Sequence, residues 1–112
     1  MEKFIQTHAH SIFSVMDAVN TPEQLIDKAV EKGHAAMCLT DHGAYGGLVR
    51  FQNYALSKGV KPIIGVEGYV VKDLVKEDEK GKRIREKNNH IILHAMNKEG
   101  WENLLYLNYI SE

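Results

Sequence analysis

The chain has 112 residues, a length typical of one domain and too short for two. It carries 14 Lys and Arg against 15 Asp and Glu, so no overall positive field draws it to nucleic acid. Its single cysteine excludes an internal disulfide and fits a reducing compartment. The first residues lack the apolar run of a secretory signal, and no apolar stretch approaches the ~20 residues needed to cross a bilayer. These features predict a cytoplasmic protein without a membrane partner.

The N-terminal part of the sequence predicts a strand followed by a helix. Residues 4–8 alternate and include β-branched side chains, which favours a short strand. Thr21 can cap a helix that begins at Pro22, and Gln24 can complete a capping box. Gly33 is the expected end of this helix. Its apolar stripe consists of Leu25, Ile26, Ala29 and Val30.

The middle of the sequence predicts two more strands with a helix between them. Residues 35–40 form an apolar run without alternation, as expected of a strand buried on both faces. Apolar residues then recur at helical spacing from Leu48, and Gly59 ends that helix. Residues 61–67 are predicted to form a third strand, and residues 68–71 either extend it or begin a hairpin.

The last third of the chain begins with a charged segment at about 72–89, predicted to be a solvated loop or hairpin. Residues 91–93 predict a fourth strand, and Asn97 is placed to cap a final helix. The apolar contacts expected of this helix come from Trp101, Leu104, Leu105, Leu107 and Tyr109. Strands that alternate with helices predict an α/β fold with parallel strands and right-handed crossover helices.

Candidate metal ligands stand where the predicted strands end. His8 and His10 follow the first strand, and residues two apart in extended chain point the same way, so both rings can meet one ion. Asp17 lies in the loop that follows them. His42 comes after the second strand, and Glu67 ends the third. Because functional side chains gather beyond the carboxyl ends of parallel strands, we expect these groups at one rim.

Each of these features has an ordinary explanation when it is taken alone. A pair of strand-end histidines can simply form hydrogen bonds in a loop, and Asp41 before a glycine-bearing loop is common turn chemistry. Glu67 could pair with a lysine. Their conjunction at three successive strand ends favours a metal site instead. Imidazoles with carboxylates suit zinc, manganese or iron, and a single cysteine rules out a thiolate-rich structural site.

Several runs of the chain match a known pattern: 7–11, Asp17, 39–43, 61–67, 90–93 and 97–104. Together they resemble the opening motifs of the PHP superfamily, most of all those of the PHP domain in bacterial DNA polymerase III alpha subunits. The resemblance implies a distorted (β/α)7 barrel with up to three divalent metal ions at the carboxyl ends of its strands. Residues 1–112 would form the first half, the N-terminal portion of one PHP domain.

The resemblance also implies a set of metal ligands, namely His8, His10, Asp17, His42, Glu67 and His90. Asp41 matches a position beside a ligand, and we predict that it supports catalysis by orienting an imidazole from behind the ligands. His90 starts its strand, so it reaches the same rim only if that strand is antiparallel. A parallel strand would place it at the opposite rim.

The implied activity is metal-dependent phosphoester hydrolysis, with 3'-5' removal of a terminal nucleotide within a replicative polymerase. The implied partners are DNA and other polymerase subunits, with the remainder of the domain or a second copy of the chain covering an open sheet edge. The alternatives are a non-catalytic structural module and a stand-alone phosphatase acting on a small phosphomonoester. The chain alone is expected to hold one or two metal ions weakly and to show little catalysis. His34 and His94 are predicted outside the site, and Cys38 as a small buried residue.

Overall fold

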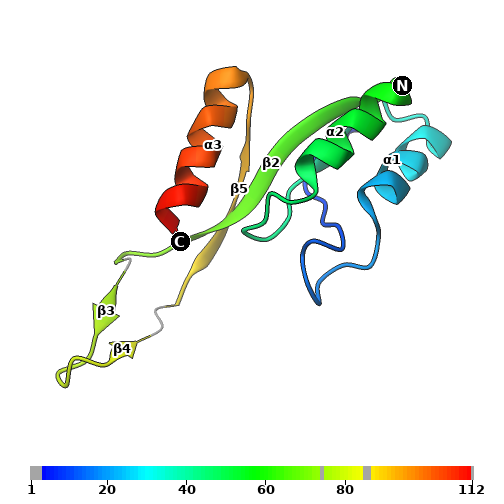
Figure 1. The fold of residues 1–112 in the computed structure, drawn as a ribbon. Coiled ribbons are helices and arrows are strands. Elements are labelled where there is room, and N and C mark those ends of the chain that lie inside the picture. The colour runs from blue at the N-terminus through cyan, green and yellow to red at the C-terminus, as the bar shows by residue number, and fades with distance from the viewer. Residues whose placement is uncertain (1–3, 74, 85–86, 112) are drawn as a thin grey trace.

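The computed structural model describes residues 4–73, 75–84 and 87–111. Figure 1 shows the elements in chain order: α1 Pro22–Glu31, β1 Ala36–Leu39, α2 Leu48–Ser57, β2 Lys61–Val70, β3 Lys76–Glu77, β4 Arg83–Ile84, β5 Asn89–His94 and α3 Lys98–Ser111. The main sheet has the order β1-β2-β5. β1 and β2 are parallel, with α2 as the crossover between them, whereas β5 runs antiparallel to β2. The predicted α/β class is confirmed, but the fourth strand does not follow the parallel pattern.

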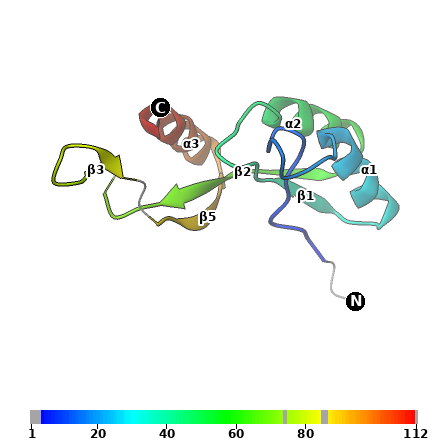
Figure 2. The same ribbon diagram turned by 90° about the horizontal axis from the view of Figure 1, so that it is seen from below.

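The three helices lie on one side of this sheet (Figure 2). The hydrophobic core forms mainly between the strands and helices α1 and α2. All four residues of β1 are buried, as the unbroken apolar run predicted. The buried core side chains are Ile26, Ala29, Met37, Leu39, Leu48, Phe51, Ala55 and Val60. Cys38 is also fully buried. Within the described ranges, no helix is long and apolar enough to cross a bilayer.

Helix α1 begins as its sequence predicted. The Thr21 hydroxyl accepts a hydrogen bond from the Gln24 backbone N–H at 3.2 Å, and the Gln24 side chain accepts one from the Thr21 N–H at 2.9 Å. This reciprocal pair satisfies two backbone donors that a helix start leaves free. The predicted apolar stripe is correct for Ile26 and Ala29, but Val30 is 47% exposed.

The N-terminal segment is not the regular strand that residues 4–8 predicted. It follows the edge of β1 with one isolated bridge, between Gln6 and Met37. The Cys38 N–H donates to the Gln6 carbonyl at 3.2 Å, and the Thr40 N–H donates to the Ala9 carbonyl at 2.8 Å. These contacts are too widely spaced for a continuous ladder. They nevertheless fix the segment beside β1, which carries it to the carboxyl end of that strand.

β2 changes partner halfway along its length. Its first half pairs with β1, and its second half, from Gly65 onward, pairs with β5. A Cβ added at Gly65 would collide with the Leu93 carbonyl oxygen and would lie 2.9 Å from the His94 ring. Glycine is therefore required here for close approach of the two strands. The close approach brings β5 against the end of β2 that carries Glu67.

The charged segment after β2 forms a hairpin rather than an unstructured loop. β3 and β4 pair antiparallel, and Gly81 adopts a positive φ of 75° in the turn between them. The hairpin projects away from the helices (Figure 1) and contributes to the longest dimension of the molecule, 56 Å. All of its strand residues are exposed. It therefore adds no buried surface to the main core.

Helix α3 is docked through fewer residues than its sequence predicted. The Asn97 side chain accepts a hydrogen bond from the Gly100 N–H at 2.8 Å, which confirms the expected cap. Leu104 is buried, and its carbonyl accepts a hydrogen bond from the Tyr45 hydroxyl at 3.0 Å. Trp101 is half-buried against the core, as predicted, whereas Leu105, Leu107 and Tyr109 are exposed. Apolar residues surround this helix, so only one flank can face the sheet.

Replacing Leu104 by Ala should lower the free energy of unfolding by about 2–5 kcal/mol, because it removes a buried side chain from the contact that docks α3. Leu107→Ala is the matched control. Leu107 is 41% exposed on the same helix, so its truncation should change stability by no more than about 0.5 kcal/mol. Urea unfolding followed by circular dichroism measures both. Equal effects of the two variants would show that α3 is not docked through Leu104.

Candidate metal centre

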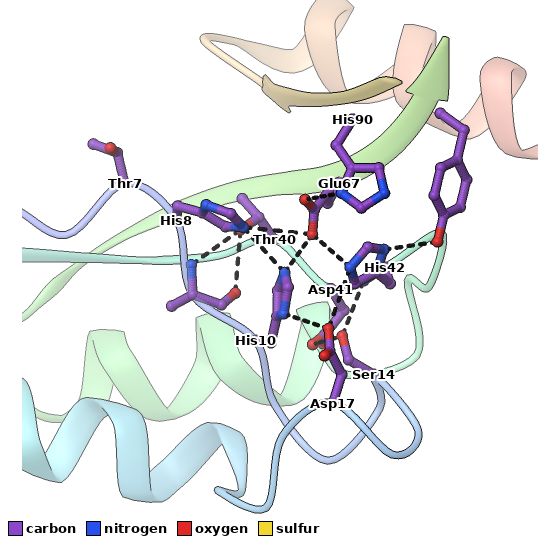
Figure 3. A network of polar contacts seen from close by, with 12 residues as sticks. Thr7, His8, His10, Ser14, Asp17, Thr40, Asp41, His42, Glu67 and His90 are labelled. Atoms are coloured by element: carbon purple, nitrogen blue, oxygen red, sulfur yellow. Dashed lines mark hydrogen bonds and ion pairs between the residues drawn. The ribbon is translucent and has the colours of Figure 1, made fainter. Parts of the chain in front are cut away.

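The carboxyl ends of β1 and β2 and the beginning of β5 meet at one rim of the sheet (Figure 3). His42 lies just beyond β1 and forms an isolated parallel bridge with Glu67 of β2. β5 is antiparallel, so its residue His90 pairs with Tyr69 at the same end of the sheet. The antiparallel alternative left open for His90 is therefore the one that the structure shows.

Glu67 stands at the middle of the cluster and is 3% exposed. Its Oε2 atom lies 2.6 Å from His10 Nε2, 2.9 Å from His42 Nε2 and 3.4 Å from His8 Nε2. Its Oε1 atom lies 3.1 Å from His90 Nδ1. One buried carboxylate thus contacts four imidazoles that come from the N-terminal segment, the loop after β1, and β5.

Asp17 supplies a second carboxylate on the solvent side of the cluster. Its Oδ2 atom lies 3.0 Å from His10 Nδ1 and 3.2 Å from His42 Nε2. Met16, immediately before it, has a φ of 68°, in the left-handed region that a non-glycine residue seldom occupies. This turn brings Asp17 back toward the histidines. Strained backbone of this kind persists only where neighbouring contacts enforce it.

Thr40 fixes the orientation of His8 and His10 through the residue between them. Its hydroxyl lies 3.1 Å from both the N–H and the carbonyl oxygen of Ala9, accepting from the first and donating to the second. Ala9 is thereby held against β1. The two histidines on either side of it both project toward Glu67, as the alternation of extended chain requires.

Asp41 is buried beneath the loop that links His10 to Asp17. Its carboxylate accepts hydrogen bonds from the Ser11 N–H at 2.6 Å, the Ser11 hydroxyl at 2.7 Å and the Ser14 hydroxyl at 2.8 Å. The Ser14 oxygen in turn accepts from the His42 N–H at 2.9 Å. Among the described residues, the hydrogen-bond partners of the Asp41 carboxylate are thus groups of the loop and not the imidazole that we predicted. It fixes the backbone that carries the ligands.

The chemistry of the donor set fits a divalent cation. Burial acts to raise the pKa of Glu67, but the attraction of His42 and the contacts with His8 and His10 hold that pKa below its ordinary value. Within the described part of the chain, the Oε2 atom of Glu67 is buried and accepts no hydrogen bond, although three ring nitrogens face it. A carboxylate oxygen and three imidazole nitrogens therefore converge on one centre, which is an arrangement that a metal ion satisfies.

Three overlapping groups of side chains have ligand atoms within 4.8 Å of one another: His8 with His10 and Glu67, His10 with Asp17 and His42, and His42 with Glu67 and His90. The structure thus brings together all six residues that the sequence analysis singled out as ligands. Their role in binding metal stays a prediction. If the imidazoles are neutral, the two carboxylates give the cluster a net negative charge, which favours divalent cations.

Two histidines lie outside this cluster, as expected. His34 precedes β1, at the other end of that strand, and its ring packs edge-on against Phe4 with centroids 5.5 Å apart. His94 is exposed, but its Nε2 donates to the Thr7 carbonyl at 2.7 Å. This bond ties the N-terminal segment to β5, and nothing in the sequence pattern indicated it.

The sequence analysis also missed residues that support the cluster without belonging to it. Ser14 and Thr40 are small polar residues near the ligands, and their hydroxyl partners depend on how the loop folds. Tyr69 could have been found, because it stands two residues beyond Glu67 and strand alternation places both on one face. Its hydroxyl lies 3.0 Å from His42 Nδ1.

Comparison with known proteins agrees with this geometry. The protein-family model for the PHP domain matches residues 6–110 of the chain. The chain belongs to the PHP domain family. It is 39% identical over 112 residues to the DNA polymerase III subunit alpha of Borreliella burgdorferi, covering 97% of this chain and 9% of that protein. The corresponding subunit of Chlamydia pneumoniae is 38% identical over 104 residues, covering 93% of this chain and 8% of the relative. This PHP chain thus spans about a tenth of the curated relatives it matches.

Solved structures share the fold of this PHP chain. A protein of Bifidobacterium adolescentis, assigned to the metal-dependent phosphoesterases, aligns with a TM-score of 0.65 at 20% identity, over 93% of this chain and 32% of that one. An amidohydrolase of Chromobacterium violaceum, with bound sulfate and no metal, aligns with a TM-score of 0.61 at 26% identity. That alignment covers 91% of this chain and 32% of the amidohydrolase.

Asp41→Ala should destabilise the fold, because it leaves two hydroxyls and one backbone N–H without their buried acceptor. The loss in unfolding free energy should exceed the about 1–3 kcal/mol that one unsatisfied buried donor costs. Asp27→Ala is the matched control, since Asp27 is an exposed carboxylate that accepts one hydrogen bond, from Tyr54. Its effect should stay within about 1 kcal/mol. An Asp41→Ala protein with the wild-type urea midpoint would contradict the anchoring role.

Proposed function

We propose that this PHP chain binds divalent metal ions and belongs to a domain that hydrolyses phosphoesters. The observation that carries the proposal is the buried Oε2 atom of Glu67, which faces three ring nitrogens without accepting a hydrogen bond. A cluster of charged and polar groups placed only for stability would be expected to satisfy such an atom. A ligand set that awaits a cation would not.

The proposed ligands are His8, His10, Asp17, His42, Glu67 and His90, with zinc, manganese or iron as the metal and up to three ions in the complete domain. Glu67 belongs to two of the three groups of side chains, so it could contribute ligand atoms to more than one ion. His10 is equally shared, because its Nε2 faces Glu67 and its Nδ1 faces Asp17. Shared ligands of this kind support a cluster of ions better than a single ion.

Bound divalent ions would supply an acidified water and stabilise negative charge on a phosphoryl oxygen. The residues of the chain supply the rest. The imidazoles and carboxylates hold the cluster at a fixed rim, and the buried position of Glu67 shields that side from water. Asp17 has a half-exposed side chain and marks the side from which a substrate can enter. No side chain needs to form a covalent bond to phosphorus.

The similarity to DNA polymerase III alpha subunits supports a proposal about the protein to which this chain belongs. We propose that the chain is the N-terminal portion of the PHP domain of a DNA polymerase III alpha subunit, forming the first half of a (β/α)7 barrel. Its proposed substrate is then the 3' end of DNA, from which it removes a terminal nucleotide. The proposed partners are DNA and the other polymerase subunits, in the cytoplasm. Among the described strands, β5 pairs only with β2, and the remainder of the domain or a second copy would cover its outer edge.

The proposal predicts that purified protein contains zinc, manganese or iron by elemental analysis. Replacing His8 and His10 together by Ala should weaken metal binding by at least about tenfold. Removing a residue that only hydrogen-bonds a metal ligand already costs about that much affinity, and this double variant removes two proposed ligands. His34→Ala is the control, because it removes a histidine at the far end of β1 and should leave the metal content unchanged. Metal content that is the same in the double variant and the wild type would refute the ligand assignment.

The substrate is tested on the full natural protein that carries this chain, supplied with Mn²⁺. We expect release of nucleotides from the 3' end of single-stranded DNA, and loss of that release in Glu67→Gln. p-Nitrophenyl phosphate and a p-nitroanilide serve as the phosphomonoester and amide comparisons. Hydrolysis of p-nitrophenyl phosphate alone would favour a small-molecule phosphatase, and hydrolysis of the amide alone an amidohydrolase. Bound metal without any hydrolysis would identify a structural module.

A further inference from the structure

Tyr69 contacts the cluster from a position outside the proposed ligand set. Its hydroxyl oxygen lies 3.0 Å from His42 Nδ1. The two rings are stacked, with centroids 5.6 Å apart and an interplanar angle of 27°. The Tyr69 ring also meets the His90 ring edge-on, with centroids 4.9 Å apart. One tyrosine therefore touches two of the imidazoles that face Glu67.

The two nitrogens of His42 face different groups. Nε2 points into the cluster, 2.9 Å from Glu67 Oε2 and 3.2 Å from Asp17 Oδ2. Nδ1 points outward to the Tyr69 hydroxyl. In a neutral imidazole one nitrogen carries the hydrogen and the other offers a lone pair, and the partner of one nitrogen decides which state is favoured. The partner of Nδ1 thus influences whether Nε2 carries a hydrogen or offers a lone pair.

We propose that Tyr69 is a positioning residue that, with a cation in the site, holds His42 with Nδ1 protonated and the Nε2 lone pair directed between Asp17 and Glu67. In this state the Nδ1–H donates to the Tyr69 oxygen. Tyr69 then keeps its own hydroxyl hydrogen free to donate toward solvent, which it reaches because the residue is 52% exposed. Acceptors of this kind behind a ligating histidine fix its ring orientation and its tautomer.

The strand supports this role for Tyr69. Tyr69 and Glu67 are two residues apart on β2, so they project from the same face. Tyr69 is also paired with His90 across the antiparallel ladder. The ring is therefore fixed by the same strand that carries the central carboxylate. His42 lies in the loop after β1, but its bridge to Glu67 of the same strand fixes its position relative to Tyr69.

Tyr69→Phe isolates the hydroxyl, because phenylalanine keeps the ring that stacks on His42. Tyr106→Phe is the matched control, since Tyr106 is an exposed tyrosine on α3. Zinc affinity is measured for each protein by competition with a chelator. Tyr69→Phe should bind zinc about 10–100-fold more weakly than wild type, and Tyr106→Phe should bind it equally well. This measurement rests on the proposed metal-binding function.

A second measurement does not depend on metal. Long-range ¹H–¹⁵N spectra of histidine-labelled protein report the protonation state of each ring nitrogen. In the metal-free chain, the His42 ring nitrogens should shift in Tyr69→Phe and not in Tyr106→Phe. In the zinc-loaded chain, wild-type His42 should show a protonated Nδ1 and a metal-bound Nε2. Circular dichroism confirms that each variant is folded.

The outcomes distinguish the proposed metal-binding function from the positioning role of Tyr69. If wild-type protein binds no zinc but His42 still responds to Tyr69→Phe, the metal function fails and the coupling of Tyr69 to His42 stands. If zinc binds with equal affinity to wild type and Tyr69→Phe, and the His42 signals do not change, the positioning role is overturned and the metal function stands. A zinc-loaded His42 that is protonated at Nε2 would also overturn it.

Discussion

Burial of the Glu67 carboxylate is the constraint on which the rest of the structure depends. An ionised group removed from water is costly unless charged or polar partners surround it. Here the partners are imidazoles delivered by three different parts of the chain, with His10 and His42 nearest. The exchange of partners along β2, the close approach at Gly65 and the antiparallel direction of β5 all serve to bring those rings to one carboxylate.

Residues that are not proposed ligands determine much of the geometry. Thr40 and Asp41 follow β1 directly, and between them they hold the backbone on both sides of His10. The polar groups of this layer are buried and satisfied, in contrast to the Oε2 atom of Glu67 in front of them. This contrast separates the two layers physically. The layer of Thr40 and Asp41 has its hydrogen bonds within the chain, whereas the layer of Glu67 has an oxygen that can still bind a cation.

The regular part of the fold and the strand-end residues could be predicted from sequence, because each depends on short-range pattern. The unbroken apolar run of β1 and the cap at Thr21 are examples, and the predicted strand ends identified His42 and Glu67 as candidate ligands. Asp17 was a candidate because it lies in the loop after His10, and the assignment of His90 came from family resemblance. The turn at Met16 could not be foreseen, since nothing local marks a methionine for a positive φ. The exposure of Leu105, Leu107 and Tyr109 on α3 was not predicted, because apolar residues occur all around this helix and do not mark one buried face.

The hydrogen bond between Thr7 and His94 joins residues 87 positions apart in the chain. Contacts of such long sequence separation form late in folding, because the entropy of closing the intervening loop must be overcome first. During synthesis, the N-terminal histidines leave the ribosome well before the strand that completes their surroundings. Assembly of the complete cluster, with His90 in place, therefore has to wait for β5. Until then, the earliest imidazoles are exposed to any metal in the cell without the geometry that would select among them.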